Sequence, residues 1–172
     1  MEFEAIARQY SGMLFRHIHR MVGNREDAQD ILQDVLLLIF RKLHTFRGDA
    51  SMKTWVFRIA SNRAIDFIRQ SRRRPTEALD ERLSTKESPL AFTQRQINID
   101  ALSQALDCLP TEQRQVVVLK EINGLTFREI SEILQIPENT AKTRMYTSLK
   151  KLRDILAEGQ DPEISNKQEI QK

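Results

Sequence analysis

The chain is poor in the residues that shape strand-rich, disulfide-bonded or membrane-spanning proteins. Its 172 residues include only 5 glycines, 5 prolines and a single cysteine. So few glycines and prolines leave few tight turns, which favours helices over many short strands. Cys108 has no second cysteine to pair with, as is typical of a reducing compartment. No apolar run approaches the ~18 residues of a transmembrane helix, and residues 1–10 are acidic and amphipathic, unlike a secretory signal. We therefore expect a cytoplasmic, helical protein without direct membrane insertion.

Charge is distributed unevenly, although the formal net charge is only +3. Residues 53–74 contain seven Lys or Arg against one Asp, and residues 137–153 contain five against one Glu. The stretch between these zones is acidic. Two basic zones with an acidic spacer are typical of a chain that contacts one polyanion twice. Ordinary solvated helix faces would produce the same charges, and composition alone does not separate the two interpretations.

The sequence divides into two helical units. Residues 1–75 form the first, which ends at an Arg-Pro step that disfavours helix. Residues 76–98 are polar and are expected to form a flexible linker. Helical periodicity returns over residues 99–157, and residues 158–172 have little to bury and are expected to form a flexible tail. The predicted fold class is all-α, with two small helical domains and a helix-turn-helix in the second.

Local signals place several helices in the second unit. Thr111 is expected to cap a helix over residues 112–122, and Gly124 suits the C-terminal cap of that helix. Thr126 and Glu129 have the spacing of a capping box, in which each side chain bonds the other residue's backbone amide. The capping box predicts that a short helix starts there.

A tight turn at Gln135-Ile136-Pro137 separates this short helix from a longer one. The predicted inward stripe of the longer helix is Ala141, Met145, Leu149, Leu152 and Leu156. Its predicted outward polar groups include Asn139, Thr140, Thr143, Arg144, Tyr146 and Lys150. In a helix-turn-helix the second helix enters the major groove, where such groups bond bases and phosphates. A plain helical hairpin with a polar outer face is the alternative.

The segment over residues 27–46 is predicted to be a helix with an acidic outer face. Its predicted core stripe is Ala28, Ile31, Leu32, Val35, Ile39 and Leu43. The residues predicted on or beside the opposite face are Asp27, Asp30, Gln33, Asp34 and Leu37. An apolar residue among carboxylates suits docking to a basic protein, with Leu37 as the anchor. Single exposed leucines are also common on monomers, so this alternative stays open.

The segment over residues 54–73 is predicted to be a basic helix with an aromatic residue on its polar face. Its predicted buried residues are Val56, Ala60, Ala64, Phe67 and Ile68. The predicted polar face consists of Trp55, Asn62, Asp66, Arg69 and Arg73, with Arg58 nearby. Such a face can follow a phosphate backbone and stack on bases of opened DNA. The preceding loop from Phe46 to Ser51 would take an extruded base. Core burial of Trp55 and Phe46 is the alternative.

Both halves together resemble the extracytoplasmic-function (ECF) sigma factors, the minimal group of bacterial RNA polymerase sigma subunits. The first half matches through AQDILQDVLLLIFRKLHTFRGDASMKTWVFRIASNRAIDFIRQSRRR. The second half matches through LPTEQRQVVVLKEINGLTFREISEILQIPENTAKTRMYTSLKKLR. The resemblance covers most of the chain and leaves out the linker and the tail. It implies a factor that binds core polymerase and directs promoter-specific initiation of a stress- or envelope-responsive set of genes.

The resemblance also implies a role for each surface. The acidic helix would dock on the clamp helices of the polymerase's largest subunit; its matching residues are Asp30, Gln33 and Asp34. The basic helix and its loop would read and open the downstream promoter element as single strand; their matching residues are Phe46, Trp55 and Asn62. The helix-turn-helix would read the upstream element as duplex; its matching residues are Thr140, Lys142 and Arg144.

The same resemblance implies a monomer that is regulated by an anti-sigma factor. It would be bound to the nucleoid when active, or held at the membrane by that regulator. No cofactor, metal or small-molecule substrate is expected: His17 and His19 point to different helix faces, and Cys108 is remote from both. A conventional dimeric helix-turn-helix regulator is the alternative function, although it leaves the first unit unexplained. An enzyme is a third hypothesis, but no phosphate loop, metal cluster or nucleophile–base pair supports it.

The linker suggests that the isolated protein binds promoter DNA poorly. A flexible coil over residues 76–98 has a root-mean-square reach of about 26 Å. The two promoter elements implied by the resemblance lie about two helical turns apart, which is roughly 70 Å. Core polymerase would hold the two units apart and convert two weak contacts into one joint engagement.

Overall fold

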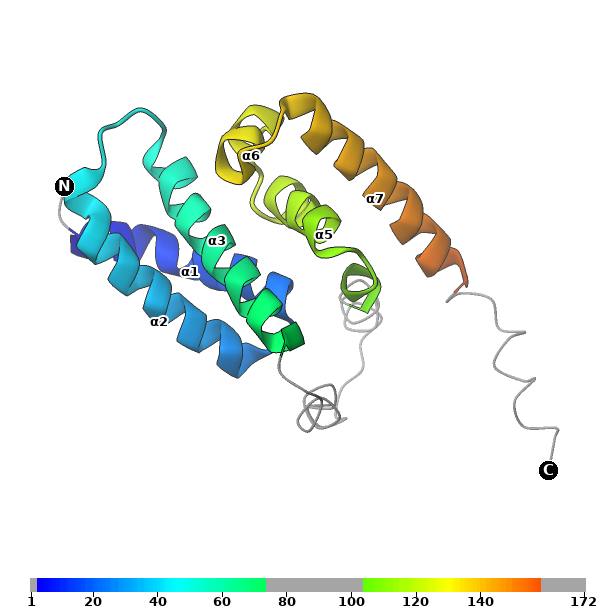
Figure 1. The fold of residues 1–172 in the computed structure, drawn as a ribbon, viewed down its shortest axis with the longest axis horizontal. Coiled ribbons are helices and arrows are strands. Elements are labelled where there is room, and N and C mark those ends of the chain that lie inside the picture. Colours follow the sequence, from blue (N-terminus) through cyan, green and yellow to red (C-terminus); the bar gives the residue numbers. More distant parts are fainter. Residues whose placement is uncertain (1–2, 74–103, 159–172) are drawn as a thin grey trace.

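The computed structural model describes residues 3–73 and 104–158, and every regular element in these two ranges is helical (Figure 1). This confirms the predicted all-α fold class. The predicted linker over residues 76–98 and nearly all of the predicted tail over residues 158–172 lie outside the described residues. No helix in the described part of the chain is long and apolar enough to cross a membrane.

The N-terminal half is a three-helix unit. It consists of α1 (Phe3–Val22), α2 (Arg25–Lys42), a short 3₁₀ turn η1 (Leu43–Thr45) and α3 (Met52–Arg73). The side chain of Asn24 caps α2 by accepting the backbone amides of Glu26 and Asp27. The fully buried positions of this unit include Leu14, Ile18, Val35, Ile39, Val56, Phe57 and Ala60.

The predicted core stripe of α3 is only partly correct. Val56, Ala60 and Ala64 are buried as predicted, but Phe67 and Ile68 are only partly buried. Phe57 and Ser61 are fully buried as well, because α3 contacts α1 and α2 on one side and the C-terminal half on another. A helix with neighbours on two sides buries a wider stripe than a helix that lies on a single core.

The C-terminal half consists of α5 (Thr111–Val117), a π-helical turn η2 (Val118–Ile122), α6 (Phe127–Leu134) and α7 (Glu138–Glu158). The capping box of α6 is formed as predicted. Gly124 follows Asn123, the C-cap residue of η2, and has a positive φ of 63°, a conformation that glycine adopts without strain. In the turn between α6 and α7 the backbone of Gln135 adopts the left-handed helical conformation, with φ 54° and ψ 46°.

Two local predictions in this half are wrong. Thr111 does not cap α5: the helix begins at Thr111 after Pro110, and no side-chain cap bond is formed. The inward stripe of α7 passes through Ser148, which is fully buried, so Leu149 is 40% exposed. A serine fits this position because its hydroxyl donates to the backbone carbonyl of Arg144, 2.6 Å away.

The two halves lie against each other. Helix α3 packs along α6, and α1 contacts both α5 and η2 (Figure 1). An apolar cluster crosses this contact, with Met21 and Ala64 buried on one side and Val118 on the other. The sequence did not predict this contact, which brings segments about a hundred residues apart into one packed structure.

Candidate functional site

The outward face of α2 is apolar as well as acidic. Asp30 and Gln33 are exposed, and Leu37 is 54% exposed, as predicted. Phe40, one turn further along, is 60% exposed and was missed by the sequence reasoning. Its ring makes an edge contact with that of Phe3, with the centroids 5.3 Å apart. The spacing of three residues between Leu37 and Phe40 is the signal that would have found it.

The other two predicted carboxylates of α2 lie in different local settings. Asp34 is half-exposed and accepts from the guanidinium of Arg63 on α3, with 3.1 Å between Nε and Oδ2. Asp27 lies in the first turn of α2, where a carboxylate is favoured by the positive end of the helix dipole. Asp34 therefore joins α2 to α3, whereas Asp30 and Leu37 are directed to solvent.

The loop before α3 brings two of the predicted aromatic residues together. The rings of Phe46 and Trp55 are 5.4 Å apart and tilted by 54°, and both side chains are half-buried. Ser51 fixes the start of the helix, because its hydroxyl accepts the backbone amide of Thr54 at 3.0 Å. The chain reverses at Gly48, which has a φ of 80°. The result is a partly open aromatic pair at the N-terminal end of α3.

The polar face of α3 is divided between solvent and the C-terminal half. Asn62, Asp66, Arg69 and Arg73 are exposed, as predicted. Arg58 is not free, because its Nη2 donates to the backbone carbonyl of Glu132 on α6 at 2.8 Å. The ammonium of Lys53, which was not among the predicted site residues, donates in the same way to the backbone carbonyl of Asn123 at 3.2 Å.

The outward face of α7 carries the predicted duplex-binding groups. Asn139 and Thr143 are exposed, Tyr146 is 67% exposed, and Thr140, Lys142 and Arg144 are half-exposed. Some of these groups are already engaged. Lys142 forms an ion pair with Glu138 at 2.7 Å, and the Thr143 hydroxyl donates to the carbonyl of Asn139. Arg144, whose fork can bond a guanine edge or a phosphate, is the strongest hydrogen-bond donor of this face.

A buried histidine joins the two halves. The ring of His17 lies edge-on to that of Phe57, with its Nε2 3.0 Å from the Ser61 hydroxyl and its Nδ1 3.1 Å from Oδ1 of Asn123. Because Oδ1 can only accept, Nδ1 carries the proton, and Nε2 of the neutral ring accepts from Ser61. Complete burial lowers the pKa of His17 to about 4, although the bond to Asn123 opposes this shift.

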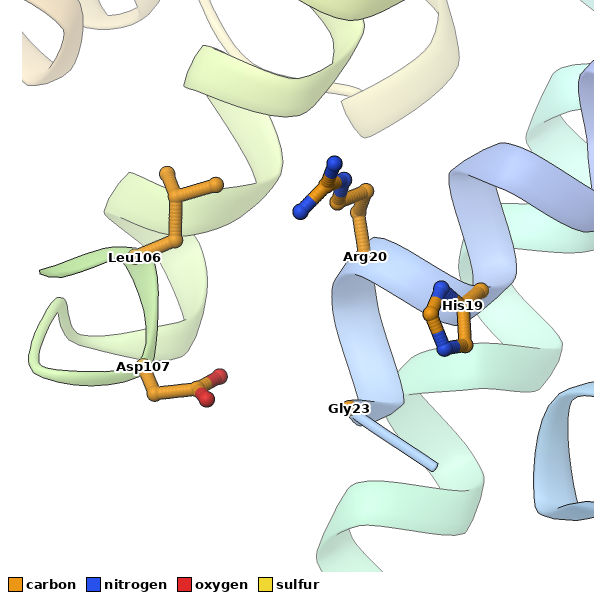
Figure 2. A pocket seen from close by; sticks show the side chains of 5 residues that line it. All are labelled: His19, Arg20, Gly23, Leu106 and Asp107. Atoms are coloured by element: carbon orange, nitrogen blue, oxygen red, sulfur yellow. The ribbon is translucent and has the colours of Figure 1, made fainter. Parts of the chain in front are cut away.

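One small hollow also lies between the halves (Figure 2). Its lining comes from the end of α1 and from the segment before α5: His19, Arg20, Gly23, Leu106 and Asp107. Its volume of about 50 Å³ is well below the ~300 Å³ of ordinary ligand pockets. Within the described ranges, no three His, Cys, Asp or Glu side chains gather to hold a metal ion.

Comparison with known protein families identifies both halves. The profile of Sigma-70 region 2 matches residues 6–74, and that of Sigma-70 region 4 matches residues 99–152. The chain is 32% identical over 160 residues to the ECF RNA polymerase sigma factor SigE of Mycolicibacterium smegmatis, covering 90% of this chain and 62% of the relative. It is 30% identical over 167 residues to the ECF RNA polymerase sigma factor SigW of Bacillus subtilis, covering 90% of this chain and 88% of the relative.

Two solved structures share the fold. One is the sigma factor RpoE of Bartonella quintana in complex with the anti-sigma factor NepR, with a TM-score of 0.71 and 23% identity over 90% of this chain and 96% of that chain. The other is CnrH in complex with the cytosolic domain of CnrY, with a TM-score of 0.68 and 21% identity over 90% of this chain and 87% of that chain.

Proposed function

Because the chain belongs to the ECF RNA polymerase sigma factors, we propose that three separate surfaces carry its function. In this proposal α2 binds core polymerase, α3 and its preceding loop bind single-stranded promoter DNA, and α7 binds duplex DNA. The alternative of a dimeric helix-turn-helix regulator is not favoured, since it leaves the N-terminal match over residues 6–74 without a purpose.

The observation that carries the assignment of α2 is its exposed apolar pair. Leu37 and Phe40 are each more than half exposed, although every other large apolar residue of this helix is at least partly buried. Exposed apolar side chains rimmed by polar groups mark protein interaction sites. Asp30 and Gln33 provide that rim on the same side, so the patch suits a basic surface such as the clamp helices of the largest polymerase subunit.

The engagement of Asp34 by Arg63 refines the sequence-based assignment. Reversing the charge of Asp34 would disturb the packing of α2 on α3 as well as any contact with polymerase. Leu37 and Asp30 are therefore the cleaner probes of core binding.

Leu37→Asp should weaken the binding of core polymerase by at least ~10-fold, because truncating an interface anchor costs ~1–2 kcal/mol or more. Surface plasmon resonance with immobilised core enzyme measures this change. Gln9→Asp is the matched control, because it adds the same charge at an exposed position of α1. If a well-folded Leu37→Asp variant bound core polymerase with unchanged affinity, the assignment of α2 to core binding would be wrong.

The assignment of α3 to single-stranded DNA is supported by the accessible aromatic pair at its start. A partly exposed Trp55 next to Phe46 offers a surface on which an unpaired base can stack. The exposed Asn62, Arg69 and Arg73 follow along the helix and provide an amide and two cations for bases and phosphates. Arg58 remains assigned to the same role, but it becomes available only when its bond to α6 is broken.

The assignment of α7 to duplex DNA is supported by the helix-turn-helix geometry and by the groups on its outward face. Asn139, Arg144 and Tyr146 are the groups best placed to contact the major groove. The ion pair between Glu138 and Lys142 lowers the positive charge at the start of this helix, so Arg144 is expected to dominate the contact.

We further propose a monomer in the cytoplasm, bound to the nucleoid when active and controlled by an anti-sigma factor that can hold it at the membrane. One structural neighbour is a sigma factor solved in complex with an anti-sigma factor, which supports this class of regulator. The protein's role in this proposal is recruitment and promoter opening, with the chemistry of RNA synthesis left to the polymerase.

A further inference from the structure

The first turn of α7 carries an acidic residue among the groups that we assign to duplex DNA. Glu138 is the first residue of this helix, and its side chain is 46% exposed. Its carboxylate forms an ion pair with the ammonium of Lys142, one turn further along, at 2.7 Å. A carboxylate at this place repels phosphates, so it weakens any binding of α7 to DNA that depends on charge alone.

The ammonium of Lys142 has two partners within the C-terminal half. Besides the carboxylate of Glu138, it lies 5.9 Å from the centroid of the Phe127 ring at the start of α6. This distance is within the ~6 Å range of a cation–π contact. Lys120 lies over the same ring, with its Nζ 5.1 Å from the centroid. The charge of Lys142 is therefore already compensated, and it becomes fully available to a phosphate only when Glu138 binds another group.

The major groove contains few partners for a carboxylate. An ionised glutamate accepts hydrogen bonds and donates none, so Glu138 needs a donor on a base edge. Guanine and thymine present only acceptors there, and adenine presents its N7 acceptor beside its amino group. Cytosine presents the N4 amino group without an acceptor of its own. Cytosine therefore accommodates Glu138 best, and each of the other bases places an acceptor near the carboxylate.

We propose that Glu138 is a specificity-determining residue that reads a cytosine amino group in duplex DNA, and that this contact releases Lys142 to a neighbouring phosphate. The inference rests on the proposed binding of duplex DNA by α7. On a site without this cytosine, Glu138 stays paired with Lys142 or faces an acceptor. The same residue therefore selects one base pair and suppresses the binding of random DNA.

A promoter library that is randomised over the upstream element tests the contact with the base. The full-length protein and core polymerase select fragments from this library, and sequencing of the bound fragments measures the base preference at each position. Wild type should prefer C·G at one position by at least about fivefold, and Glu138→Ala should lose this preference. Glu132→Ala is the matched control, because it removes a carboxylate from another i,i+4 ion pair, with Arg128 on α6. The control should keep the preference.

The salt dependence of binding to a random duplex tests the release of Lys142. Fluorescence anisotropy of labelled duplex with the full-length protein gives the slope of log affinity against log salt concentration, and circular dichroism confirms the fold of each variant. Glu138→Ala should make this slope steeper by ~0.9, the value for one additional phosphate contact. In a Lys142→Ala background the same substitution should leave the slope unchanged, because no cation is then released.

Two results would overturn the proposal. One is a folded Glu138→Ala variant with the base preference of wild type, and the other is a slope that steepens equally with and without Lys142. Arg144→Ala separates this failure from that of the proposed function. If Arg144→Ala weakens the selection of upstream sequences and Glu138→Ala does not alter it, only the inference about Glu138 is wrong. If Arg144→Ala leaves the selection intact, the assignment of α7 to duplex DNA is itself wrong.

Discussion

Lowering the pH from 7 to 5 should destabilise the protein through His17. The ring is completely buried, and burial lowers its pKa from the ordinary 6.5 to about 4. The folded state therefore binds a proton less readily than the unfolded state does. Stability from this residue is fully present above about pH 6.5 and is lost as the pH falls towards 4.

The magnitude follows from the size of the shift. Each pKa unit corresponds to about 1.4 kcal/mol, so the complete effect is about 3 kcal/mol. Between pH 7 and pH 5 the free energy of unfolding should fall by about 2 kcal/mol from His17 alone. Such a loss is a large share of the ~5–15 kcal/mol stability of an ordinary domain.

Urea denaturation at both pH values, for wild type and for His17→Gln, isolates this contribution. The glutamine does not titrate, so the variant should lose about 2 kcal/mol less than wild type between pH 7 and pH 5. His19, whose pKa burial also lowers, titrates in both proteins and cancels in the comparison. Equal pH dependence of the two proteins would refute the reasoning, whatever the absolute stability of the variant.

Three further predictions concern the C-terminal half and the division of labour between the DNA-binding surfaces. Thr126→Ala removes one side of the capping box and should lower the free energy of unfolding by ~1 kcal/mol in urea melts; an unchanged midpoint would contradict this role. Glycine adopts the left-handed backbone conformation of residue 135 without strain, so Gln135→Gly should raise the free energy of unfolding by ~0.5 kcal/mol in the same assay. A lower free energy of unfolding would show that the Gln135 side chain contributes more than the relief of backbone strain. Asn62→Ala should impair promoter opening in permanganate footprints and regain activity on a pre-melted bubble, whereas Arg144→Ala should weaken closed-complex binding by ~1–3 kcal/mol. Failure of both variants at the same step would contradict separate roles for α3 and α7.

Features fixed by nearby residues could be predicted from the sequence. The capping box of α6 depends on two residues three positions apart, and the exposure of Leu37 follows from helical periodicity. The prediction that Leu149 faces inward on α7 was wrong because both Leu149 and Ser148 border the inward stripe. Hydrophobic periodicity favours the leucine and does not account for a serine that can be buried because its hydroxyl bonds a carbonyl of its own helix. Phe40 was placed on neither face of α2 by the sequence analysis, although it lies three residues after Leu37.

Contacts between the halves could not be predicted. The charge pattern identified Arg58 as a basic group on α3, but its partner is a backbone carbonyl 74 residues away. Main-chain acceptors carry no sequence signature, so pattern reasoning assigned Arg58 to DNA together with Arg69 and Arg73. The bond of His17 to Asn123, 106 residues away, had no signal in the sequence. Poor DNA binding by the free chain, which was predicted from the linker, stays a prediction, because residues 76–98 lie outside the described residues.

Run-off transcription tests the central claim most directly. Core RNA polymerase from the same organism, genomic promoter fragments and the purified protein should give discrete transcripts that core enzyme alone does not produce. Leu37→Asp should reduce these transcripts at limiting protein concentration, and Gln9→Asp should not. Transcripts that are the same with and without the protein, from a chain that binds DNA as a dimer, would contradict its assignment as a sigma factor.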